Sequence, residues 1–392
     1  MKSQLSEQGR WPYFAEDEIQ AVTEVLRSGK VNQWTGPHVK KFEQAFAHYI
    51  GVDHAIAMAN GTVTLETALR ACGVGVGDEV IVSPRTFLAT ASSVVMCGAT
   101  PIFTDVDLQS QNITAQTIAE KVTPRTKAII PVHLAGWPCE MDEIMSLAEA
   151  NNLYVIEDCA QAHGAEYKGK KVGAWGHVGS FSFCQDKIMT TGGEGGMVVT
   201  NDETLWKKMW SWKDHGKDYD AVFNTEHPPG FRWLHGDFGT NLRMSAMQAA
   251  IGSQQLTKLD DWVAVRRKYA EKLQRALAEF SCISVPMPGP ESVHAFYKFY
   301  CFVKPELLAS GWSRDRIMQE ITQRGIPCFS GSCSEIYLEK CFEKQGLQPE
   351  KRLPNAQQLG ETSLMFMVHP TLSEQDIDQT IAIIQEVLNN AC

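Results

Sequence analysis

The chain has 392 residues, of which 44% are hydrophobic and 21% charged, and its formal net charge is −10. This composition is typical of a globular enzyme, and the length allows two domains. The net negative charge, with no basic stripe along the chain, argues against nucleic acid as the main partner.

The eleven cysteines are scattered singly, and no CxxC pair occurs among them. The odd count and the chain length argue against a disulfide framework, and most of these side chains are expected to be apolar fillers in a reducing compartment. The opening MKSQLSEQGRWPYFAEDE has no apolar run suited to a signal peptide, and no segment reaches the roughly 18 apolar residues of a membrane span. We therefore expect a cytoplasmic protein with no membrane partner and no metal site.

A helix is predicted over residues 15–28, with Gly29 as its C-cap. From residue 54, short β-rich runs alternate with helical stretches. The predicted strands span residues 54–59, 78–83, 100–106, 126–134, 153–158, 179–183 and 196–201. The predicted helices among them span 63–72, 90–98 and 141–152. Strands joined by helical crossovers form a mostly parallel sheet covered on both faces. The sequence therefore predicts a large three-layer α/β domain over residues 1–254, with an N-terminal arm and helix.

The pattern changes near residue 255. Residues 256–280 are predicted to form one long amphipathic helix with charges of both signs on its polar face. After it come predicted strands at 296–304 and 363–370 and predicted helices at 313–325 and 373–390. The last helix starts with the capping-box-like pair Ser373 and Asp376. We expect a smaller α+β domain over residues 255–392, hinged on the long helix.

The first candidate site is the sequence Asn60-Gly61-Thr62, where a predicted strand stops and a helix is expected to begin at Thr62. The glycine allows a tight turn, and free backbone N–H groups, the helix dipole and the threonine hydroxyl would form an anion pocket. The alternative is an N-cap with no further role. The glycine string at residues 73–77 follows a helix rather than a strand, so it is not the dinucleotide fingerprint of a nicotinamide dehydrogenase.

Asp158 ends the predicted strand 153–158, where ligand-contacting side chains usually lie in an open α/β sheet. A carboxylate so close to the core needs a cationic or hydrogen-bonding partner, which could be a ligand or a structural salt bridge. Gln161 and His163 follow closely. His163 is expected to pack or to bond locally rather than to catalyse.

Lys187 lies in the stretch SFSFCQDKIMTTGGEGG. Ser180 and Ser182 alternate with phenylalanines, so both hydroxyls face one side of the strand, and the second hydroxyl and Lys187 could approach one ligand. Partial desolvation at a sheet end disfavours the charged form of a lysine and makes it a nucleophile toward carbonyls. The alternative is an ion pair with Asp186 or Glu194.

Together, the three candidate sites are the parts needed to hold pyridoxal 5'-phosphate (PLP). A helix N-terminus would bind the phosphate, a carboxylate would keep the pyridine nitrogen protonated, and a lysine would form the Schiff base. Each of the three comes from the end of a different predicted strand, which makes the combination far more specific than any member of it.

These residues and their surroundings resemble the DegT/StrS family of sugar aminotransferases, within the aspartate-aminotransferase-like (fold type I) PLP enzymes. The resemblance covers nearly the whole chain and rests on SGKVNQWTGPHVKKFEQAFAHYIGV, ANGTVTLETALRACGVGVGDEVIV, GATPIFTDVD, VIEDCAQAHGA, SFSFCQDKIMTTGGEGG and GTNLRMSAMQAAIG. Two stretches depart from the family pattern. TTGGEGG carries an additional glycine, and GIPCFSGSCSEIYLEKCF replaces a more histidine-rich sequence.

The resemblance implies a role for eight residues. These are Lys187 for the Schiff base, Gly61, Thr62 and Ser182 for the phosphate, Asp158 for the ring nitrogen, Gln161 near the ring hydroxyl, Phe87 stacked on the ring, and Asn241 for the phosphate of the neighbouring subunit. The last assignment implies a homodimer with shared active sites.

The resemblance further implies a transaminase that moves the amino group of L-glutamate to a nucleotide-linked keto-sugar, a 4-keto-6-deoxyhexose. Such a reaction would serve amino-sugar and surface polysaccharide biosynthesis, including lipopolysaccharide. The alternatives are a glutamine-dependent keto-inositol (cyclitol) aminotransferase and a non-catalytic PLP-fold regulatory protein. Related sugar dehydratases carry histidine in place of the Schiff-base lysine, so Lys187 argues against that reaction. Trp34, His133 and Arg243 are candidate sugar contacts by position, each equally consistent with a structural role.

Overall fold

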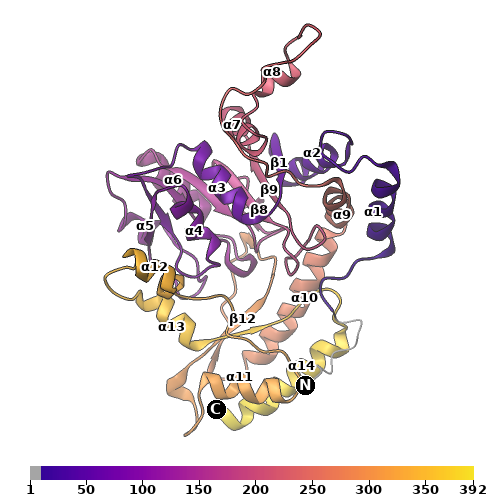
Figure 1. Ribbon diagram of the computed structural model, residues 1–392. Helices are drawn as coiled ribbons and strands as arrows, with labels where there is room; N and C mark the ends of the chain where they lie inside the picture. Colours follow the sequence, from indigo (N-terminus) through magenta and orange to yellow (C-terminus); the bar gives the residue numbers. More distant parts are fainter. Residues whose placement is uncertain (1–9) are drawn as a thin grey trace.

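The computed structural model describes residues 10–392, and Figure 1 shows its two parts. The first nine residues belong to the segment expected not to be a signal peptide, and they lie outside the described residues. Between residues 10 and 392, no helix is long and apolar enough to cross a membrane.

A seven-stranded sheet in the order β1-β9-β8-β5-β4-β2-β3 lies at the centre of the larger part. Its strands are β1 (His54–Met58), β2 (Glu79–Val82), β3 (Thr100–Phe103), β4 (Thr126–Ile130), β5 (Tyr154–Asp158), β8 (Val178–Ser182) and β9 (Gly196–Thr200). Only β9 runs antiparallel to its neighbours, β1 and β8. All seven strands overlap the predicted ranges, and the mostly parallel sheet is confirmed.

Helices cover both faces of this sheet, as the alternation of strands and helices predicted (Figure 1). They include α2 (His38–Ile50), α3 (Gly61–Ala71), α4 (Ala89–Met96), α5 (Ala115–Ala119), α6 (Met141–Ala150) and α7 (Glu203–Lys213). The two faces are clear along β8. Phe181 packs against Phe46 of α2, with ring centroids 5.0 Å apart. Ser180 points the other way, and its Oγ lies 2.8 Å from the Thr64 Oγ1 of α3.

The helix at the chain start and the long helix between the two parts were predicted from the sequence, whereas a third helix was not. Helix α1 (Glu16–Ser28) ends at Gly29 with a φ of 67°, as expected. The long helix predicted over 256–280 is confirmed as α10 (Leu259–Leu277), and a turn separates it from the preceding helix α9 (Ala246–Leu256). Helix α9, which the sequence analysis missed, begins with a capping box between Ser245 and Gln248.

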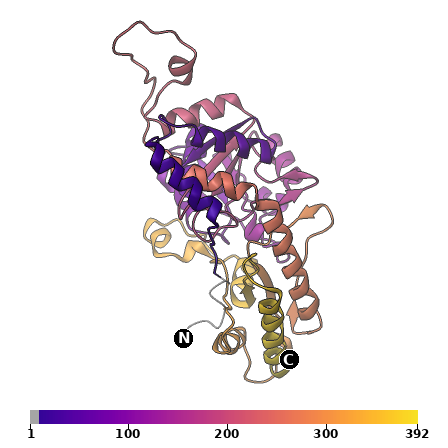
Figure 2. The same ribbon diagram turned by 90° about the vertical axis from the view of Figure 1, so that its right-hand side faces the viewer.

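The smaller part is built on a three-stranded antiparallel sheet in the order β10-β12-β13. Its elements are β10 (Ile283–Ser284), β12 (Phe299–Val303), β13 (Ser363–Phe366), α11 (Arg314–Gln323) and α14 (Glu374–Ala391). The predicted capping box of Ser373 and Asp376 is present at the start of α14. Figure 2 shows α14 and the long α10 running along this part. The predicted strands and helices of this region are therefore confirmed, and the domain boundary at residue 254 stays a prediction.

Helices α12 (Lys340–Gln345) and α13 (Pro354–Thr362) pack against the edge of the large sheet, and α13 also contacts β12 of the small one. The Phe342 ring lies 5.4 Å from the Phe103 ring of β3, and the Asn355 and Ala356 backbone N–H groups donate to Asp105. The remaining short elements are β6 (Glu166–Tyr167), β7 (Lys170–Lys171), β11 (Ser292–Val293), α8 (Tyr219–Phe223) and three 3₁₀ turns at 134–136, 305–307 and 336–338.

A segment of residues 219–240, which we call the arm, extends away from the rest of the larger part. It contains α8 and the loop that follows it, and both views show it projecting from the top (Figure 1, Figure 2). Three large aromatic side chains on it are almost fully exposed, namely Phe231 at 81%, Trp233 at 86% and Phe238 at 91%. The arm therefore presents apolar surface that no other part of residues 10–392 covers.

One disulfide occurs among the scattered cysteines, which were expected to form no disulfide framework. Cys282 and Cys392 are joined, with their Cα atoms 5.9 Å apart. The two residues are separated by 110 positions in the sequence, so no spacing motif signals the pair. They meet because α14 packs along α10, which brings the end of the chain beside Cys282. The segment after the 3₁₀ turn 305–307 also holds this end, since the Ala309 backbone N–H donates to the Ala391 carbonyl.

Candidate active site

A cavity of about 1020 Å³ lies where β1, β5 and β8 end. Carboxyl ends of parallel strands are the usual ligand site of an open α/β sheet. Seven of the eight predicted site residues line the cavity, namely Gly61, Thr62, Phe87, Asp158, Gln161, Ser182 and Lys187. Residues of the smaller part close the other side, among them Tyr297, Lys298 and Met367.

The start of α3 and the end of β8 touch at this cavity. The Asn60 Oδ1 accepts the backbone N–H groups of Thr62 and Val63, each at 3.1 Å, so the N-cap is present. Helix α3 begins at Gly61, one residue before the predicted start. A Cβ on Gly61 would lie 2.5 Å from the Ser182 Cβ. At that distance the two atoms overlap, so α3 or β8 would have to move. Only glycine therefore lets these two segments meet.

Asp158 is the last residue of β5 and is 5% exposed. Its Oδ2 accepts the Thr90 hydroxyl at 2.8 Å, and its Oδ1 accepts the Ala160 backbone N–H at 3.1 Å. Burial raises the pKa of Asp158, and these two hydrogen bonds and the Lys187 charge offset only part of that rise. Within residues 10–392, no cationic side chain lies within 4.0 Å of this carboxylate, so the structure does not support the structural salt bridge.

Gln161 is oriented by a turn that also contacts the smaller part. Its Oε1 accepts the Ala135 backbone N–H at 2.8 Å, which leaves its amide N–H groups for the cavity. Ala135 has a φ of 56°, a left-handed conformation that is uncommon outside glycine. The turn is held from both sides. The Leu134 backbone N–H donates to the Asn112 Oδ1 at 3.1 Å, and the Tyr297 backbone N–H donates to the Ala135 carbonyl at 2.8 Å. The wall beside Gln161 is thus fixed by contacts from two parts of the chain.

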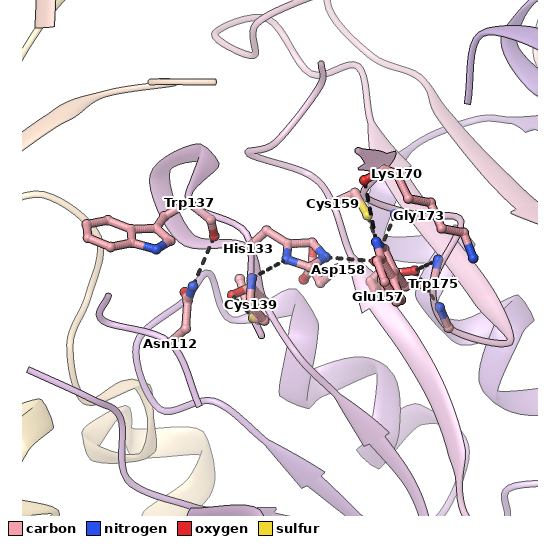
Figure 3. Close-up of polar contacts among 12 residues, drawn as sticks. Asn112, His133, Trp137, Cys139, Glu157, Asp158, Cys159, Lys170, Gly173 and Trp175 are labelled. Carbon is pink, nitrogen blue, oxygen red and sulfur yellow. Dashed lines mark hydrogen bonds and ion pairs between the residues drawn. The ribbon is translucent and has the colours of Figure 1, made fainter. Parts of the chain in front are cut away.

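A buried hydrogen-bond network lies behind Asp158, and Figure 3 shows it. The His133 Nδ1 accepts the Cys139 backbone N–H at 3.0 Å, so its proton is on Nε2, which donates to the Glu157 Oε2 at 3.0 Å. The Glu157 carboxylate also accepts three backbone N–H groups, from Gly173, Trp175 and Gly176.

His133 and Glu157 are fully buried, and His133 does not line the cavity. This placement does not support His133 as a sugar contact. His133, Glu157 and Cys159 each have one atom of a kind that can bind a metal, and these three atoms lie within 4.8 Å of one another. The ring nitrogens and the carboxylate oxygens are already hydrogen-bonded, so the arrangement is suited to anchoring the end of β5.

Lys187 lies at the cavity, with its side chain 16% exposed. Its Nζ is 4.0 Å from the Asp186 Oδ1 and 5.1 Å from the centroid of the Tyr297 ring. The Tyr297 hydroxyl donates a short hydrogen bond to the Asp186 Oδ2. Burial works to raise the pKa of Asp186, but the Lys187 charge and the Tyr297 hydroxyl outweigh it and hold that pKa below its usual range. The ion pair with Asp186 is therefore long, and the Lys187 ammonium stays open to the cavity.

Comparison with known proteins identifies the family of this chain. The sequence matches the model of the DegT/DnrJ/EryC1/StrS aminotransferase family over residues 12–385. The chain belongs to this family. The resemblance stated from the sequence is confirmed, and the protein is an aminotransferase with the fold of the fold type I PLP enzymes.

Three relatives of this aminotransferase show how far the similarity extends. It is 34% identical over 381 residues to the spore coat polysaccharide biosynthesis protein SpsC of Bacillus subtilis, covering 97% of this chain and 96% of that one. It is 38% identical over 360 residues to the GDP-perosamine synthase of Caulobacter vibrioides, covering 90% and 91%. The crystal structure of an aminotransferase from Psychrobacter cryohalolentis matches with a TM-score of 0.96 and 56% identity, covering 98% of this chain and 99% of that one.

Asn241, Trp34 and Arg243 of the aminotransferase lie apart from this cavity, at the base of the arm. Trp34 donates its indole N–H to the Asp214 Oδ2 at 3.1 Å, and Arg243 donates to the Oδ1 of the same carboxylate at 2.9 Å. Asn241 is exposed and pairs with Asp214 through a β-bridge. The structure brings these three residues together, but not with the cavity of their own chain.

His163 is buried against the rings of Phe181 and Phe183, with centroids 5.5 and 5.6 Å away. Burial lowers the pKa of His163 to about 3, so the ring is neutral near pH 7. Both observations fit the expectation that this histidine packs.

The sequence analysis missed the residues of the smaller part that line the cavity. Tyr297 and Lys298 belong to the predicted strand 296–304, for which no functional residue was predicted. A signal was present, because a lysine within the aromatic run FYKFYCF is unusual in a buried strand.

Proposed function

We propose that this aminotransferase uses PLP to transfer the amino group of L-glutamate to a nucleotide-linked keto-sugar, a 4-keto-6-deoxyhexose. The product would serve amino-sugar synthesis for surface polysaccharides such as lipopolysaccharide. One observation carries the proposal. A single cavity collects a lysine, a buried carboxylate with no cationic side chain of residues 10–392 within 4.0 Å, and a glycine–serine contact from the ends of three strands. The similarity to a GDP-perosamine synthase and to a spore coat polysaccharide protein supports a nucleotide-linked sugar and a polysaccharide product.

The residues at the cavity fit PLP. The Gly61 backbone and the hydroxyls of Thr62 and Ser182 form a cradle that a side chain at position 61 would fill, which suits a phosphate. Burial raises the pKa of Asp158, and a protonated ring nitrogen beside it would stabilise the carboxylate. The free amide N–H groups of Gln161 suit the ring hydroxyl.

Two further residues would complete the binding of PLP. Phe87 is 70% exposed and lines the cavity, so its ring is available for stacking on the cofactor. Lys187 lines the cavity from the segment that follows β8, and we assign to it the covalent bond with the cofactor. Bound there, PLP would supply the electron sink that makes the α-proton of an amino acid acidic.

The chain's own residues would then move the proton. Once Lys187 is a free amine, its Nζ takes the proton from the donor's α-carbon, and in the second half of the cycle it delivers a proton to the carbon that receives the amine. Asp186 and Tyr297 would hold this amine within the cavity, since the Asp186 Oδ1 lies 4.0 Å and the Tyr297 ring centroid 5.1 Å from the Lys187 Nζ. The Asp158 carboxylate would supply negative charge at the end of β5, away from the Lys187 amine.

We further propose that the active form is a homodimer in which Asn241 completes the neighbouring site. In its own chain Asn241 does not reach the cavity, yet it lies at the base of the arm, whose aromatic side chains are exposed. Phe231, Trp233 and Phe238 offer apolar surface of the kind that a protein partner covers. A second copy of the chain is the occupant that would bring Asn241 to a phosphate.

A cytoplasmic location is part of the same proposal, because nucleotide-linked sugars and L-glutamate are supplied in that compartment. Apart from the disulfide between Cys282 and Cys392, the nine other cysteines of the chain are free, and all of them lie within the described residues. That state suits a reducing compartment.

The proposal is tested with purified protein loaded with PLP. Addition of L-glutamate should shift the visible absorption band of the cofactor, and a nucleotide-linked 4-keto-6-deoxyhexose should restore it. Restoration by keto-inositol after reaction with glutamine would instead support the cyclitol aminotransferase, and no shift with any donor would support the non-catalytic protein. Lys187→Ala should abolish both changes, whereas the matched variant Lys304→Ala, outside the cavity, should behave as the wild type.

A further inference from the structure

A second lysine lines the cavity and has no part in the function proposed above. Lys298 immediately precedes β12, on the wall that the smaller part contributes. Its Nζ lies 4.7 Å from the centroid of the Tyr297 ring, the same ring that the Lys187 Nζ approaches at 5.1 Å. Both ammonium groups therefore lie around one aromatic ring beside the reacting centre.

The charge of Lys298 is poorly compensated. Among residues 10–392, the Lys298 Nζ donates one hydrogen bond, to the Met367 sulfur at 3.4 Å, and a thioether is only a weak acceptor. No carboxylate of the described residues lies within 4.0 Å of this Nζ. The charged and titratable groups that face it are Asp186, Lys187, Arg266, Tyr297 and His369. A half-buried ammonium with a weak acceptor and two neighbouring cations is suited to receive an anion.

We propose that Lys298 binds a carboxylate of the amino donor. This inference rests on the proposed function and deepens it, because it names the group that recognises the donor. The donor must place its amino group at Lys187 and must also bury at least one carboxylate in the same cavity. The Lys187 Nζ already has the Asp186 carboxylate 4.0 Å away, whereas the Lys298 Nζ has no carboxylate of the described residues that close. Lys298 belongs to the wall that the smaller part contributes, and the phosphate cradle belongs to the larger part.

A charged phosphate of the nucleotide-linked sugar is the other anion that this lysine could meet. The position beside Tyr297, next to the group that handles the proton, favours the donor carboxylate, since a diphosphate belongs to the part of the sugar substrate remote from the reacting carbon. Burial lowers the pKa of Lys298 to about 8, so the group is mostly charged at pH 7 and loses its charge as the pH rises through about 8. Donor affinity should fall over that same range.

The test uses the PLP-loaded enzyme and glutarate, a dicarboxylate that carries no amino group and cannot react. Its dissociation constant is measured by calorimetry for the wild type, Lys298→Met, Lys298→Arg and the control Lys304→Met, which alters a half-buried lysine just after β12 and outside the cavity. A charge-assisted hydrogen bond corresponds to roughly ten- to hundredfold in affinity. Lys298→Met should weaken glutarate binding by about that factor, and Lys298→Arg and Lys304→Met should leave it nearly unchanged.

The pH dependence provides a readout that a packing role would not move. Wild-type affinity for glutarate should fall between about pH 7 and pH 9, and Lys298→Arg should keep its affinity, because arginine does not titrate in that range. In single half-reactions, Lys298→Met should raise the half-saturating L-glutamate concentration and leave the reaction with the keto-sugar unchanged.

Two results would overturn the inference. One is glutarate binding to Lys298→Met as tightly as to the wild type. The other is an equal loss in the keto-sugar half-reaction, which would assign the lysine to the sugar phosphate. Neither result touches the proposed function, which fails separately if the wild type shows no spectral change with any amino donor.

Discussion

The contact between Gly61 and Ser182 makes a sharp prediction about cofactor affinity. In Gly61→Ala the new Cβ would lie 2.5 Å from the Ser182 Cβ and 3.0 Å from its Oγ. Carbon atoms in contact lie about 3.5–4.0 Å apart, so α3 and β8 must separate by about 1 Å. Overpacking of this kind costs about 1–3 kcal/mol. The apoenzyme can relieve the strain by opening the cradle, whereas the PLP-bound enzyme must keep it closed around the phosphate.

The strain should therefore appear as a loss of PLP affinity of about five- to hundredfold, at 1.4 kcal/mol for each factor of ten. The assay is an equilibrium titration of the apoenzyme with PLP, followed by absorbance. The matched control is Gly75→Ala, because a Cβ at that position meets no atom within 4 Å. Unchanged affinity in Gly61→Ala, or an equal loss in Gly75→Ala, would refute the assignment of this contact to the phosphate.

Three further predictions concern the carboxylates and the arm. Asp158→Asn should lower the turnover number by roughly a hundredfold or more in steady-state assays while Lys187 remains labelled by PLP, because it removes the charge that faces the ring nitrogen; near-normal turnover would contradict this role. Glu157→Gln should lower the free energy of unfolding in urea by about 1–3 kcal/mol, since the amide NH₂ would face buried N–H donors; an unchanged urea midpoint would show that the network is not an anchor. The double variant Trp233→Ser and Phe238→Ser should shift the mass measured by light scattering from dimer to monomer, and a stable dimer would exclude the arm from the interface.

Much of the sheet could be predicted because each strand is a short apolar run that ends at a polar or glycine residue. Asp158 and Lys187 were found by the same reasoning, since carboxyl ends of parallel strands share one edge of a sheet. The alternation of Ser180 and Ser182 with phenylalanines fixed their face correctly, because the side-chain period of a strand is two.

The parts that escaped prediction depend on contacts between distant segments. The approach of Gly61 to Ser182 spans two strands, and the wall formed by Tyr297 and Lys298 comes from the other part of the chain. Helix α9 was missed because its many Ala, Gly and Gln residues give little apolar periodicity. Sequence reasoning had no means to place these contacts, although the lysine within FYKFYCF marked the position.

The central claim is that Lys187, and no other lysine, carries the cofactor. Borohydride reduction of the PLP-loaded protein, followed by proteolysis and mass spectrometry, tests it most directly. We predict a pyridoxyl group on the peptide that contains Lys187. A pyridoxyl group on Lys298 instead, or none on any lysine, would contradict the account.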